Sequence, residues 1–232
     1  MIITIDGPAG SGKSTSAKLV ARKLGFTYLD TGAMYRAITF LALKNNTMEE
    51  PEIAKLAENA KISLGFEDGQ TSVKLNDENV TEEIRTFTVN SNVSEVSVIP
   101  AVRTALVRMQ REIGQNSNIV AEGRDTGTTV FPDADVKIFL VASLRERARR
   151  RLKEFQEKGE NVTLEEIEFN LNKRDDIDSH RAVSPLAKAE DAIEIDTSNL
   201  TIEQQVDQIL EKVAEAAKSK GFEELNILFE RK

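Results

Sequence analysis

The stretch Gly7-Pro8-Ala9-Gly10-Ser11-Gly12-Lys13-Ser14 decides the fold, because it matches the pattern G-x-x-x-x-G-K-[ST] at every fixed position. Glycines let the backbone of such a loop turn tightly and point successive N–H groups at phosphate oxygens. Lys13 is expected to reach the β- and γ-phosphates of ATP, and the Ser14 hydroxyl to hold Mg²⁺ together with phosphates and waters. The residues predicted to bind ATP are Gly7, Pro8, Ala9, Gly10, Ser11, Gly12, Lys13, Ser14 and Thr15.

The segments on either side of this loop are those that the motif requires. Ile2–Asp6 is a short apolar run, typical of a buried parallel strand, and Lys13–Leu24 has the apolar spacing of a helix. Further along, strand-like and helical patterns alternate, which favours a parallel sheet with helices on both faces. The other predicted strands are Thr27–Leu29, Asn118–Ala121, Val136–Ala142 and Ile193–Ile195. The sequence therefore predicts a single α/β chain of 232 residues with the three-layer fold of P-loop NTPases.

One part of the chain departs from this alternation. Ile62–Phe66 and Thr71–Leu75 have the pattern of two strands joined by the turn residues Glu-Asp-Gly-Gln. A compact antiparallel piece inside an α/β chain is typical of an insert, and we place this one at about residues 60–85. Helical patterns resume after it at Thr86–Val98 and Ala101–Gly114.

Composition limits the possible functions. The net charge of −8 argues against non-specific binding of nucleic acid, so an anionic ligand must meet local groups of Arg and Lys. The chain has no cysteine, which excludes a disulfide framework, a Cys-ligated zinc site and a thiol nucleophile. The N-terminal residues show no signal-peptide pattern, and the apolar runs are too short to span a bilayer. We expect a cytoplasmic monomer that acts on small molecules, with neither nucleic acid nor a membrane as partner.

Two other classes of phosphate-loop protein compete with a small-molecule kinase. Asn172-Lys173-Arg174-Asp175 has the N-K-x-D form with which GTP-binding switches read guanine, but it ends a helical segment instead of following a strand. A switch would also carry D-x-x-G, and no Asp in this chain has Gly three residues later. A motor or transporter ATPase would show an apolar strand ending in Asp, whereas Ile138–Ala142 is followed by Ser. A small-molecule kinase is therefore the leading hypothesis.

The strongest further signal is charge beside turn residues at the ends of strands. The segments DTGAMYR (30–36) and EGRDTG (122–127) each follow a predicted strand, and a third charged segment covers residues 173–181. In an open α/β sheet, ligands bind at the carboxyl ends of the strands. A planar guanidinium group donates two hydrogen bonds at once, which suits a phosphate. We expect one arginine from each segment to converge on an acceptor phosphate, namely Arg36, Arg124 and Arg181.

The motifs together resemble a known family. IDGPAGSGKST, DTGAMYR, EIRT, EGRDTGTTVFPDADVKIFL and RDDIDSHRAVSPL make the chain similar to the long form of bacterial cytidylate kinases, from Ile2 to about Leu210. The resemblance implies ATP-dependent phosphorylation of CMP and dCMP by direct in-line transfer with Mg²⁺. It also implies that the insert belongs to an enlarged monophosphate-binding domain. The segment Gly221–Lys232 resembles nothing in the family, and we assign it no function.

The resemblance also implies roles for individual residues. It gives the cytosine to Ser94, Arg103 and Asp125, the ribose to Arg174 and Asp178, and the acceptor phosphate to the three arginines named above. Thr31 stands where the family often has a serine in its D-[ST]-G turn. Threonine keeps the hydroxyl, so we keep Thr31 among the residues that would bind CMP. The residues that would bind CMP are Thr31, Arg36, Ser94, Arg103, Arg124, Asp125, Arg174, Asp178 and Arg181.

In this family, the basic helix around Arg147 leads into a mobile lid over ATP, which we place at about residues 147–162. Arg147 and Arg151 are four residues apart and share one face of the helix, so both are candidates for clamping the transferring phosphoryl group. The alternative is a solvated basic face that pairs with Glu146 and Glu154. The catalytic candidates are Lys13, Arg124, Arg147 and Arg151.

The residues do not show the acceptor directly, so a phosphate-loop kinase for UMP, AMP or shikimate is the closest competing hypothesis. His180 is the only histidine of the chain. Direct phosphoryl transfer needs positioning and charge neutralisation more than a strong base. We therefore expect His180 to take no part in the reaction.

Overall fold

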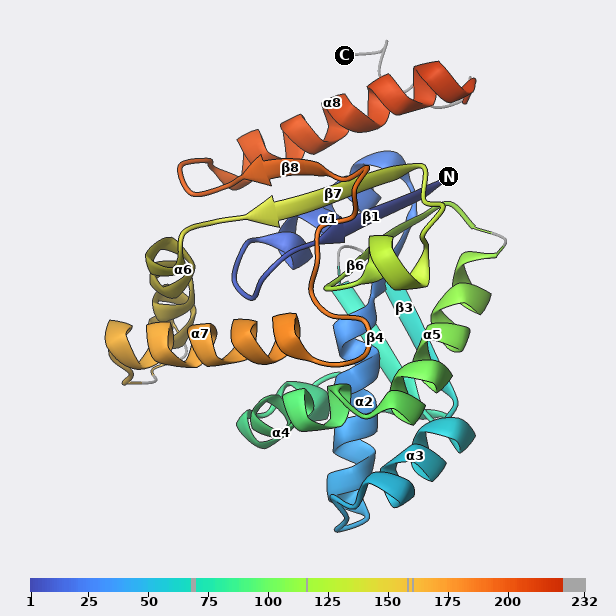
Figure 1. Cartoon of the computed structure of the whole chain (residues 1–232), viewed down its shortest axis with the longest axis vertical. Coiled ribbons are helices and arrows are strands. Elements are labelled where there is room, and N and C mark those ends of the chain that lie inside the picture. Colours follow the sequence, from blue (N-terminus) through green and yellow to red (C-terminus); the bar gives the residue numbers. More distant parts are fainter. Residues whose placement is uncertain (68–69, 116, 158, 160, 223–232) are drawn as a thin grey trace.

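The central sheet has five parallel strands in the order β2-β6-β1-β7-β8 (Figure 1). The structure, a computed structural model, describes residues 1–67, 70–115, 117–157, 159 and 161–222. The strands of this sheet are β1 (Ile2–Asp6), β2 (Thr27–Asp30), β6 (Ile119–Gly123), β7 (Val136–Val141) and β8 (Ile193–Asp196). The predicted α/β fold with a central parallel sheet is confirmed.

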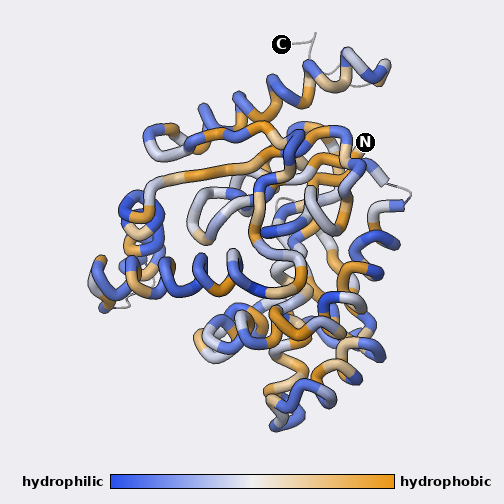
Figure 2. The backbone as a smooth tube through the Cα atoms, in the orientation of Figure 1, coloured by the Kyte–Doolittle hydropathy of each residue, from blue (hydrophilic) through white to orange (hydrophobic). Residues whose placement is uncertain are grey.

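Alternation along the strands divides the core into two halves. Val120 packs with the apolar residues of one set of helices and its neighbour Ala121 with those of the other, because successive side chains of a strand point to opposite faces. One face is covered by α1 (Lys13–Leu24) and α8 (Ile202–Lys220), the other by α2 (Thr31–Lys44) and α5 (Pro100–Gly114). Figure 2 shows that α8 is polar along its outer side and apolar towards the sheet. None of the helices in the described ranges has the length and apolar character needed to cross a bilayer.

The predicted insert is a second, antiparallel sheet. Its strands are β3 (Ile62–Glu67), β4 (Gln70–Leu75) and β5 (Glu78–Asn79), in that order. Val73 and Leu75 of β4 are buried in the same core as α2, so the insert is packed onto the main body of the chain. Around it lie α3 (Glu50–Asn59), the short turn η1 (Glu83–Arg85) and α4 (Phe87–Ser97). Residues 68 and 69 of the predicted turn lie outside the described residues.

Two helices, α6 (Leu144–Glu157) and α7 (Leu164–His180), pack against each other beside the sheet (Figure 1). A capping box at Thr163 begins α7, which ends at His180. The lid predicted at about 147–162 corresponds to most of α6 and the connection that follows, of which residues 158 and 160 lie outside the described residues. Of the segment Gly221–Lys232, the structure describes the first two residues.

A buried carboxylate at the end of β1 holds the loop that follows β6. Asp6 Oδ1 accepts hydrogen bonds from the backbone N–H and the hydroxyl of Thr126, at 2.9 and 2.8 Å, and Oδ2 accepts from the Gly127 N–H at 2.7 Å. Burial raises the pKa of Asp6, although these three hydrogen bonds favour the ionised form. The carboxyl ends of β1 and β6 are therefore joined by side chain as well as by the strand ladder.

A single π-helical turn, η2 (Thr126–Val130), continues this loop and was not predicted from the sequence. Such turns occur mostly as short irregular pieces and are frequent at functional sites. The Arg111 side chain of α5 donates to the carbonyl oxygens of Thr129 and Val130, at 2.7 and 2.9 Å. The loop after β6 is thus fixed from both sides.

We expect Asp6→Asn to lower the free energy of unfolding by about 2–3 kcal/mol, because the amide NH₂ would face a buried N–H donor and leave it unsatisfied. Chemical denaturation measures this change. Asp133→Asn, at an exposed carboxylate, is the matched control and should change stability by less than about 0.5 kcal/mol. An Asp6→Asn protein as stable as the parent would show that the loop does not depend on this carboxylate.

Candidate active site

A cavity of about 390 Å³ opens where β1, β2 and β6 end. The phosphate loop, the segments that follow β2 and β6, and helices α4, α6 and α7 all contribute to its wall. The predicted site residues that line it are Ala9, Gly10, Lys13, Ser14, Thr31, Arg36, Ser94, Arg124, Asp125, Arg151, Arg174, Asp178 and Arg181. The predicted site residues outside the lining are Gly7, Pro8, Ser11, Gly12, Thr15, Arg103 and Arg147. Segments far apart in the sequence therefore meet at one place, at the sheet edge where ligands bind in such folds.

Two glycines fix the path of the phosphate loop. Gly7 has φ of +145°, and a Cβ atom at this position would lie 2.1 Å from the carbonyl oxygen of Leu140 on β7. Gly12 has φ of +93° immediately before the first turn of α1. Neither position can take a side chain without moving the backbone, which gives the glycines of the motif a steric reason.

Lys13 lies folded back over the loop. Its Nζ donates to the carbonyl oxygen of Pro8 at 2.6 Å and approaches Ser11 Oγ at 3.5 Å. Burial and the nearby charge of Arg124 hold the pKa of Lys13 well below its usual value, while the Glu122 carboxylate acts in the opposite direction. An anion beside Lys13 would favour its charged form. The electrostatics of this position therefore suit a phosphate group.

The two arginines predicted to clamp the phosphoryl group have different surroundings. Arg147 is buried, donates to the carbonyl oxygens of Ala9 and Ala142 at 3.0 Å each, and pairs with Asp175. The other Asp175 oxygen accepts from the Ala9 N–H at 3.3 Å, so this pair holds the phosphate loop against α6 and α7.

Arg151, in contrast, lines the cavity. It pairs with Glu154 at 2.6 Å and its guanidinium lies 5.1 Å from the centre of the Phe155 ring. The predicted pairing with Glu154 is therefore present, and of the two arginines Arg151 alone faces the ligand space.

The last part of the chain supports the phosphate loop from its other side. The fully buried Gln205 of α8 donates through Nε2 to Ser16 Oγ at 2.6 Å. The Thr197 hydroxyl, just after β8, donates to the carbonyl oxygen of Ser11 at 3.1 Å. A Cβ atom on Gly12 would meet the Gln205 amide at 2.8 Å. The loop is thus enclosed by residues some 190 positions away in the sequence.

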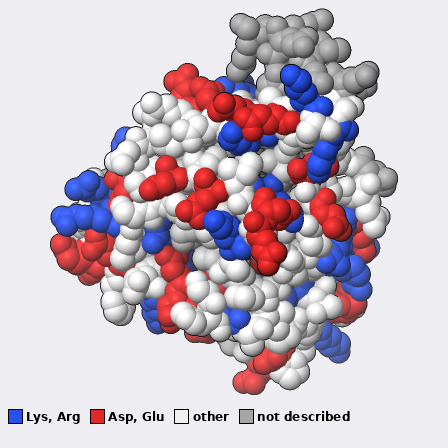
Figure 3. Space-filling model, turned by 45° about the horizontal axis from the view of Figure 1, so that its top comes forward, with Lys and Arg blue, Asp and Glu red and all other residues white. Residues whose placement is uncertain are grey.

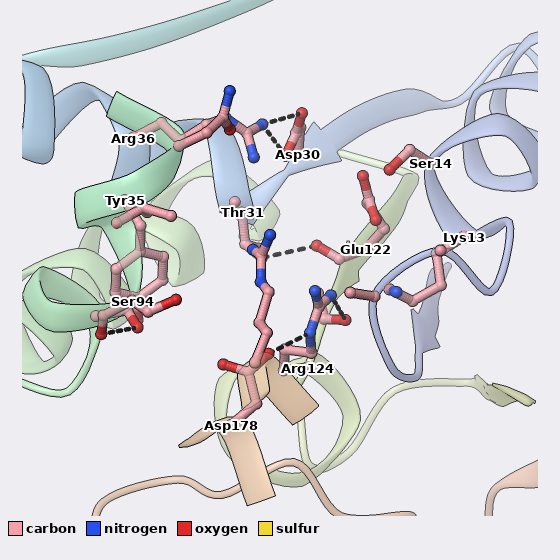
Figure 4. Close-up of a pocket in the computed structure, with 18 of the residues that line it drawn as sticks. Lys13, Ser14, Asp30, Thr31, Tyr35, Arg36, Ser94, Glu122, Arg124 and Asp178 are labelled. Atoms are coloured by element: carbon pink, nitrogen blue, oxygen red, sulfur yellow. Dashed lines mark hydrogen bonds and ion pairs between the residues drawn. The ribbon is translucent and has the colours of Figure 1, made fainter. Parts of the chain in front are cut away.

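Arg124, Arg174 and Asp178 form one charged group. Figure 4 shows Arg124 and Asp178 side by side. Arg124 Nε donates to Asp178 Oδ2 at 2.8 Å. Burial opposes the charged form of Asp178, but Arg124 and Arg174 outweigh it and lower the pKa of that carboxyl. Burial and the repulsion of Arg124 lower the pKa of Arg174 to about 10. Two partly buried guanidinium groups share one carboxylate here, so the group can accept a further anion.

Asp125 lies between two other arginines. One of its oxygens accepts from Arg103 and the other from Arg181 at 3.0 Å. Arg103 also donates to the Ser97 carbonyl oxygen at 3.1 Å, and its guanidinium lies 5.2 Å from the centre of the Tyr35 ring. Arg103 therefore sits behind the lining and fixes the Asp125 carboxylate that faces the cavity.

The other predicted residues are distributed as follows. Arg36 pairs with Asp30 at 3.1 Å, and the Thr31 hydroxyl donates to the Glu122 carbonyl oxygen at 2.7 Å. Ser94 lies on α4, across the cavity from Lys13 (Figure 4). His180 is exposed at the end of α7 and does not belong to the lining.

The cavity is positive although the chain is acidic. Its lining contains five carboxylates, Asp30, Glu122, Asp125, Glu154 and Asp178. It contains eight cationic side chains, Lys13, Lys18, Arg36, Arg85, Arg124, Arg151, Arg174 and Arg181. On the outer face seen in Figure 3, acidic and basic side chains are interspersed. The excess of positive charge in the cavity fits the expectation that an anionic ligand meets a local group of arginines and lysines.

Comparison with known proteins decides the family. The profile of the cytidylate kinase family matches residues 3–215 of this chain. The chain belongs to the cytidylate kinase family. A cytidylate kinase of Lactobacillus johnsonii is 48% identical over 221 residues, which are 94% of this chain and 96% of the relative. That of Carboxydothermus hydrogenoformans is 52% identical over 213 residues, 91% of this chain and 96% of the relative.

The resemblance predicted from the motifs is thus confirmed, and with it a kinase of the P-loop type. A bifunctional pantoate ligase/cytidylate kinase of Trichormus variabilis is 52% identical over 216 residues, which are 90% of this chain but 40% of that protein. The N-K-x-D fragment that favoured a GTP-binding switch lies inside α7, where Arg174 belongs to the cavity wall. The alternatives of a switch and of a motor ATPase are set aside.

One carboxylate of the site, Glu122, was not predicted from the sequence. Glu122, 5% exposed, ends the apolar part of β6 and lines the cavity. The strand Ile138–Ala142, considered for an acidic end, falls on β7 and the residue after it, whereas Glu122 is on β6, between β1 and β2. The signal was the apolar run Ile119–Ala121 followed by Glu.

We expect Arg147→Ala to lower the free energy of unfolding by about 3 kcal/mol, because it leaves the Asp175 carboxylate and the Ala9 carbonyl without their buried partner. Arg151→Ala is the matched control from the same helix. Its exposed pair with Glu154 should contribute less than about 1 kcal/mol. Denaturation of both variants tests the difference, and equal losses would contradict the separate positions of the two arginines.

Proposed function

We propose that this chain transfers the terminal phosphoryl group of ATP to CMP and dCMP, by direct in-line transfer with Mg²⁺. The observation that carries the proposal is the pairing of two kinds of group in one cavity. Lys13 and the phosphate loop lie on one side, and Asp125, held between Arg103 and Arg181, faces the same space. The loop with Lys13 suits a triphosphate. Asp125 with its two arginines suits a base that has both donors and acceptors on its edge.

The donor would bind at the loop Gly7–Thr15. The amino end of α1 adds its positive dipole to Lys13 there. Ser14 is exposed at the cavity wall, and its hydroxyl would hold the ion together with phosphate oxygens and waters, an all-oxygen set that suits Mg²⁺. When bound, Mg²⁺ would neutralise charge on the β- and γ-phosphates.

The acceptor phosphate would bind among Arg36, Arg124 and Arg181. The lowered pKa of Arg174 beside them supports an anion at this place, because a phosphate would relieve the repulsion between Arg174 and Arg124. We assign Arg174 and Asp178 to the ribose. Thr31, whose hydroxyl is fixed on the Glu122 carbonyl oxygen, would lie next to the phosphate.

The base would be read by Ser94, Arg103 and Asp125. A carboxylate accepts from the 4-amino group of cytosine and repels the 4-carbonyl of uracil. Because Arg103 and Arg181 hold both oxygens of Asp125, the carboxylate keeps a fixed orientation for this contact.

In the reaction, an oxygen of the CMP phosphate attacks the γ-phosphorus while the bond from that phosphorus to the bridging oxygen of ADP breaks. Lys13 and Arg124 would stabilise the charge that develops on the transferred group. Arg151 would be the lid arginine that reaches it, and Arg147 would act through the loop that it holds. The attacking phosphate oxygen is already an anion, so no strong base is required.

A coupled assay of ADP release tests the proposal across CMP, dCMP, UMP, AMP, GMP and shikimate. We expect CMP and dCMP to be the best acceptors, with Mg²⁺ required. Lys13→Ala should reduce turnover by about 10²-fold, since it removes one preorganised charge from the transition state. A faster reaction with UMP, AMP or shikimate would replace the proposed acceptor, and normal turnover of Lys13→Ala would contradict the donor site.

That the protein is cytoplasmic and monomeric stays a prediction from the sequence.

Asp125→Asn should narrow the preference for CMP over UMP. The parent should favour CMP by up to about 10⁴-fold in kcat/KM, because uracil would leave buried polar groups unpaired. The amide of Asn can donate to the uracil carbonyl, so we expect the ratio to fall by about tenfold or more. Lys13→Ala, which acts on the donor, is the control and should lower both rates by the same factor. If Asp125→Asn also lowers both equally, Asp125 does not read the base.

A further inference from the structure

Arg151, the lid arginine to which we assign the transferring phosphoryl group, already has a partner. Its guanidinium pairs with Glu154 on the same helix at 2.6 Å, and the two side chains are 43% and 56% exposed. Ion pairs so open to solvent contribute little to stability. A phosphate group can accept two hydrogen bonds from one guanidinium, so a bound nucleotide would take Arg151 away from Glu154. The Glu154 carboxylate would then be left without a cation beside negatively charged phosphates.

A cation without an acidic partner belongs to the same cavity. Arg85, on the short turn η1 that follows the insert, is exposed and lines the cavity together with Arg151 and Glu154. Its backbone is held by Asn90, whose side-chain amide donates to the Arg85 carbonyl oxygen at 2.9 Å. In the described part of the chain, no carboxylate lies within salt-bridge distance of the Arg85 guanidinium. This charge is therefore available to a carboxylate that loses its own partner.

An exposed aromatic ring lies next to Arg85 in the sequence. Phe87 begins α4 and is 81% exposed. Phe87 and Ser94 are seven residues apart and therefore share one face of the helix, and Ser94 lines the cavity. A large apolar side chain gains free energy when it is removed from water. Arg85 and Phe87, which we call the insert rim, thus offer a positive charge and an aromatic ring on the side of the ligand space.

The end of α6 offers the complementary groups. Glu154 is followed by Phe155, whose ring lies 5.1 Å from the centre of the Arg151 guanidinium. Helices α4 and α6 both contact α7, so the insert rim and the end of α6 border the same helix (Figure 1). A guanidinium and an aromatic ring on the insert rim therefore match a carboxylate and an aromatic ring on α6.

We propose that Arg85 is a positioning residue: when both nucleotides are bound, it pairs with Glu154 and leaves Arg151 to the transferring phosphoryl group. Phe87 packs against the end of α6 in the same state. After this exchange of partners, the phosphate, the carboxylate and both guanidinium groups are all paired. The inference rests on the proposed kinase function. It makes the reactive position of Arg151 depend on a residue that follows the insert, which has no other assigned part in the reaction.

A tryptophan on the insert rim would report its approach to α6, since the chain has no tryptophan of its own. The ligand is an unreactive analogue in which adenosine and cytidine are joined by five phosphates. We expect the emission of Phe87→Trp to shift to shorter wavelength when this analogue binds, because the ring leaves water. Phe169→Trp is the matched control, an exposed position of α7 outside the cavity wall, and should show no shift. Unchanged emission of Phe87→Trp with the analogue bound would overturn the proposal.

A double-mutant cycle tests the ion pair itself, with calorimetry of the same analogue. Arg85→Gln should weaken analogue binding by about fivefold in the parent but by less than about twofold in Glu154→Gln, because the pair is then already lost. The affinity of Arg85→Gln for CMP alone should equal that of the parent.

Equal losses in both backgrounds would overturn the proposal, and so would weaker binding of CMP alone, which would mean that Arg85 contacts the acceptor directly. In the assay of ADP release, Arg85→Gln should lower kcat and leave the KM for CMP unchanged, whereas a change confined to KM would contradict a positioning role. A parent protein that binds neither the analogue nor CMP would refute the kinase function itself.

Discussion

The site depends on the hydrogen bonds that the buried Asp6 carboxylate accepts from Thr126 and Gly127. Asp6 ends the central strand just before the phosphate loop, and it takes three hydrogen bonds from the loop that carries Arg124 and Asp125. A nucleotide donor and an acceptor must be held at a fixed separation for in-line transfer. Because Asp6 ties the loop after β6 directly to the strand before the phosphate loop, the two halves of the cavity cannot shift independently.

Charge in the cavity is organised as linked pairs. Asp178 forms an ion pair with Arg124, Asp125 with both Arg103 and Arg181, and Asp30 with Arg36. Such pairing offsets the cost of removing several guanidinium groups from water, which would be unfavourable for unpaired cations. The cations still outnumber the carboxylates, so the cavity keeps a net attraction for phosphate. The overall acidity of the chain does not oppose this, since the attraction is local.

Much of this site could be read from the sequence, since a phosphate loop requires its strand and helix, and charged segments after strands meet at one sheet edge. The ion-pair partner of each charged side chain could not be predicted in this way. Arg147 and Arg151 have the same periodicity, yet one is buried against Ala9 and the other faces the ligand space. That difference depends on how α6 packs on α7. Glu122 was missed because strand order, which places β6 between β2 and β1, is a property of the folded sheet.

The support given to the phosphate loop by Gln205 and Thr197 has a consequence for biosynthesis. The ribosome makes the loop about 190 residues before it makes these supports. At 5–20 residues per second, the loop waits roughly 10–40 s for them. The strand β1 waits as well, because its neighbours β6 and β7 come from the second half of the chain. Nascent chains therefore carry the nucleotide motif before its supports exist, and competence to bind should emerge only after translation has passed Gln205.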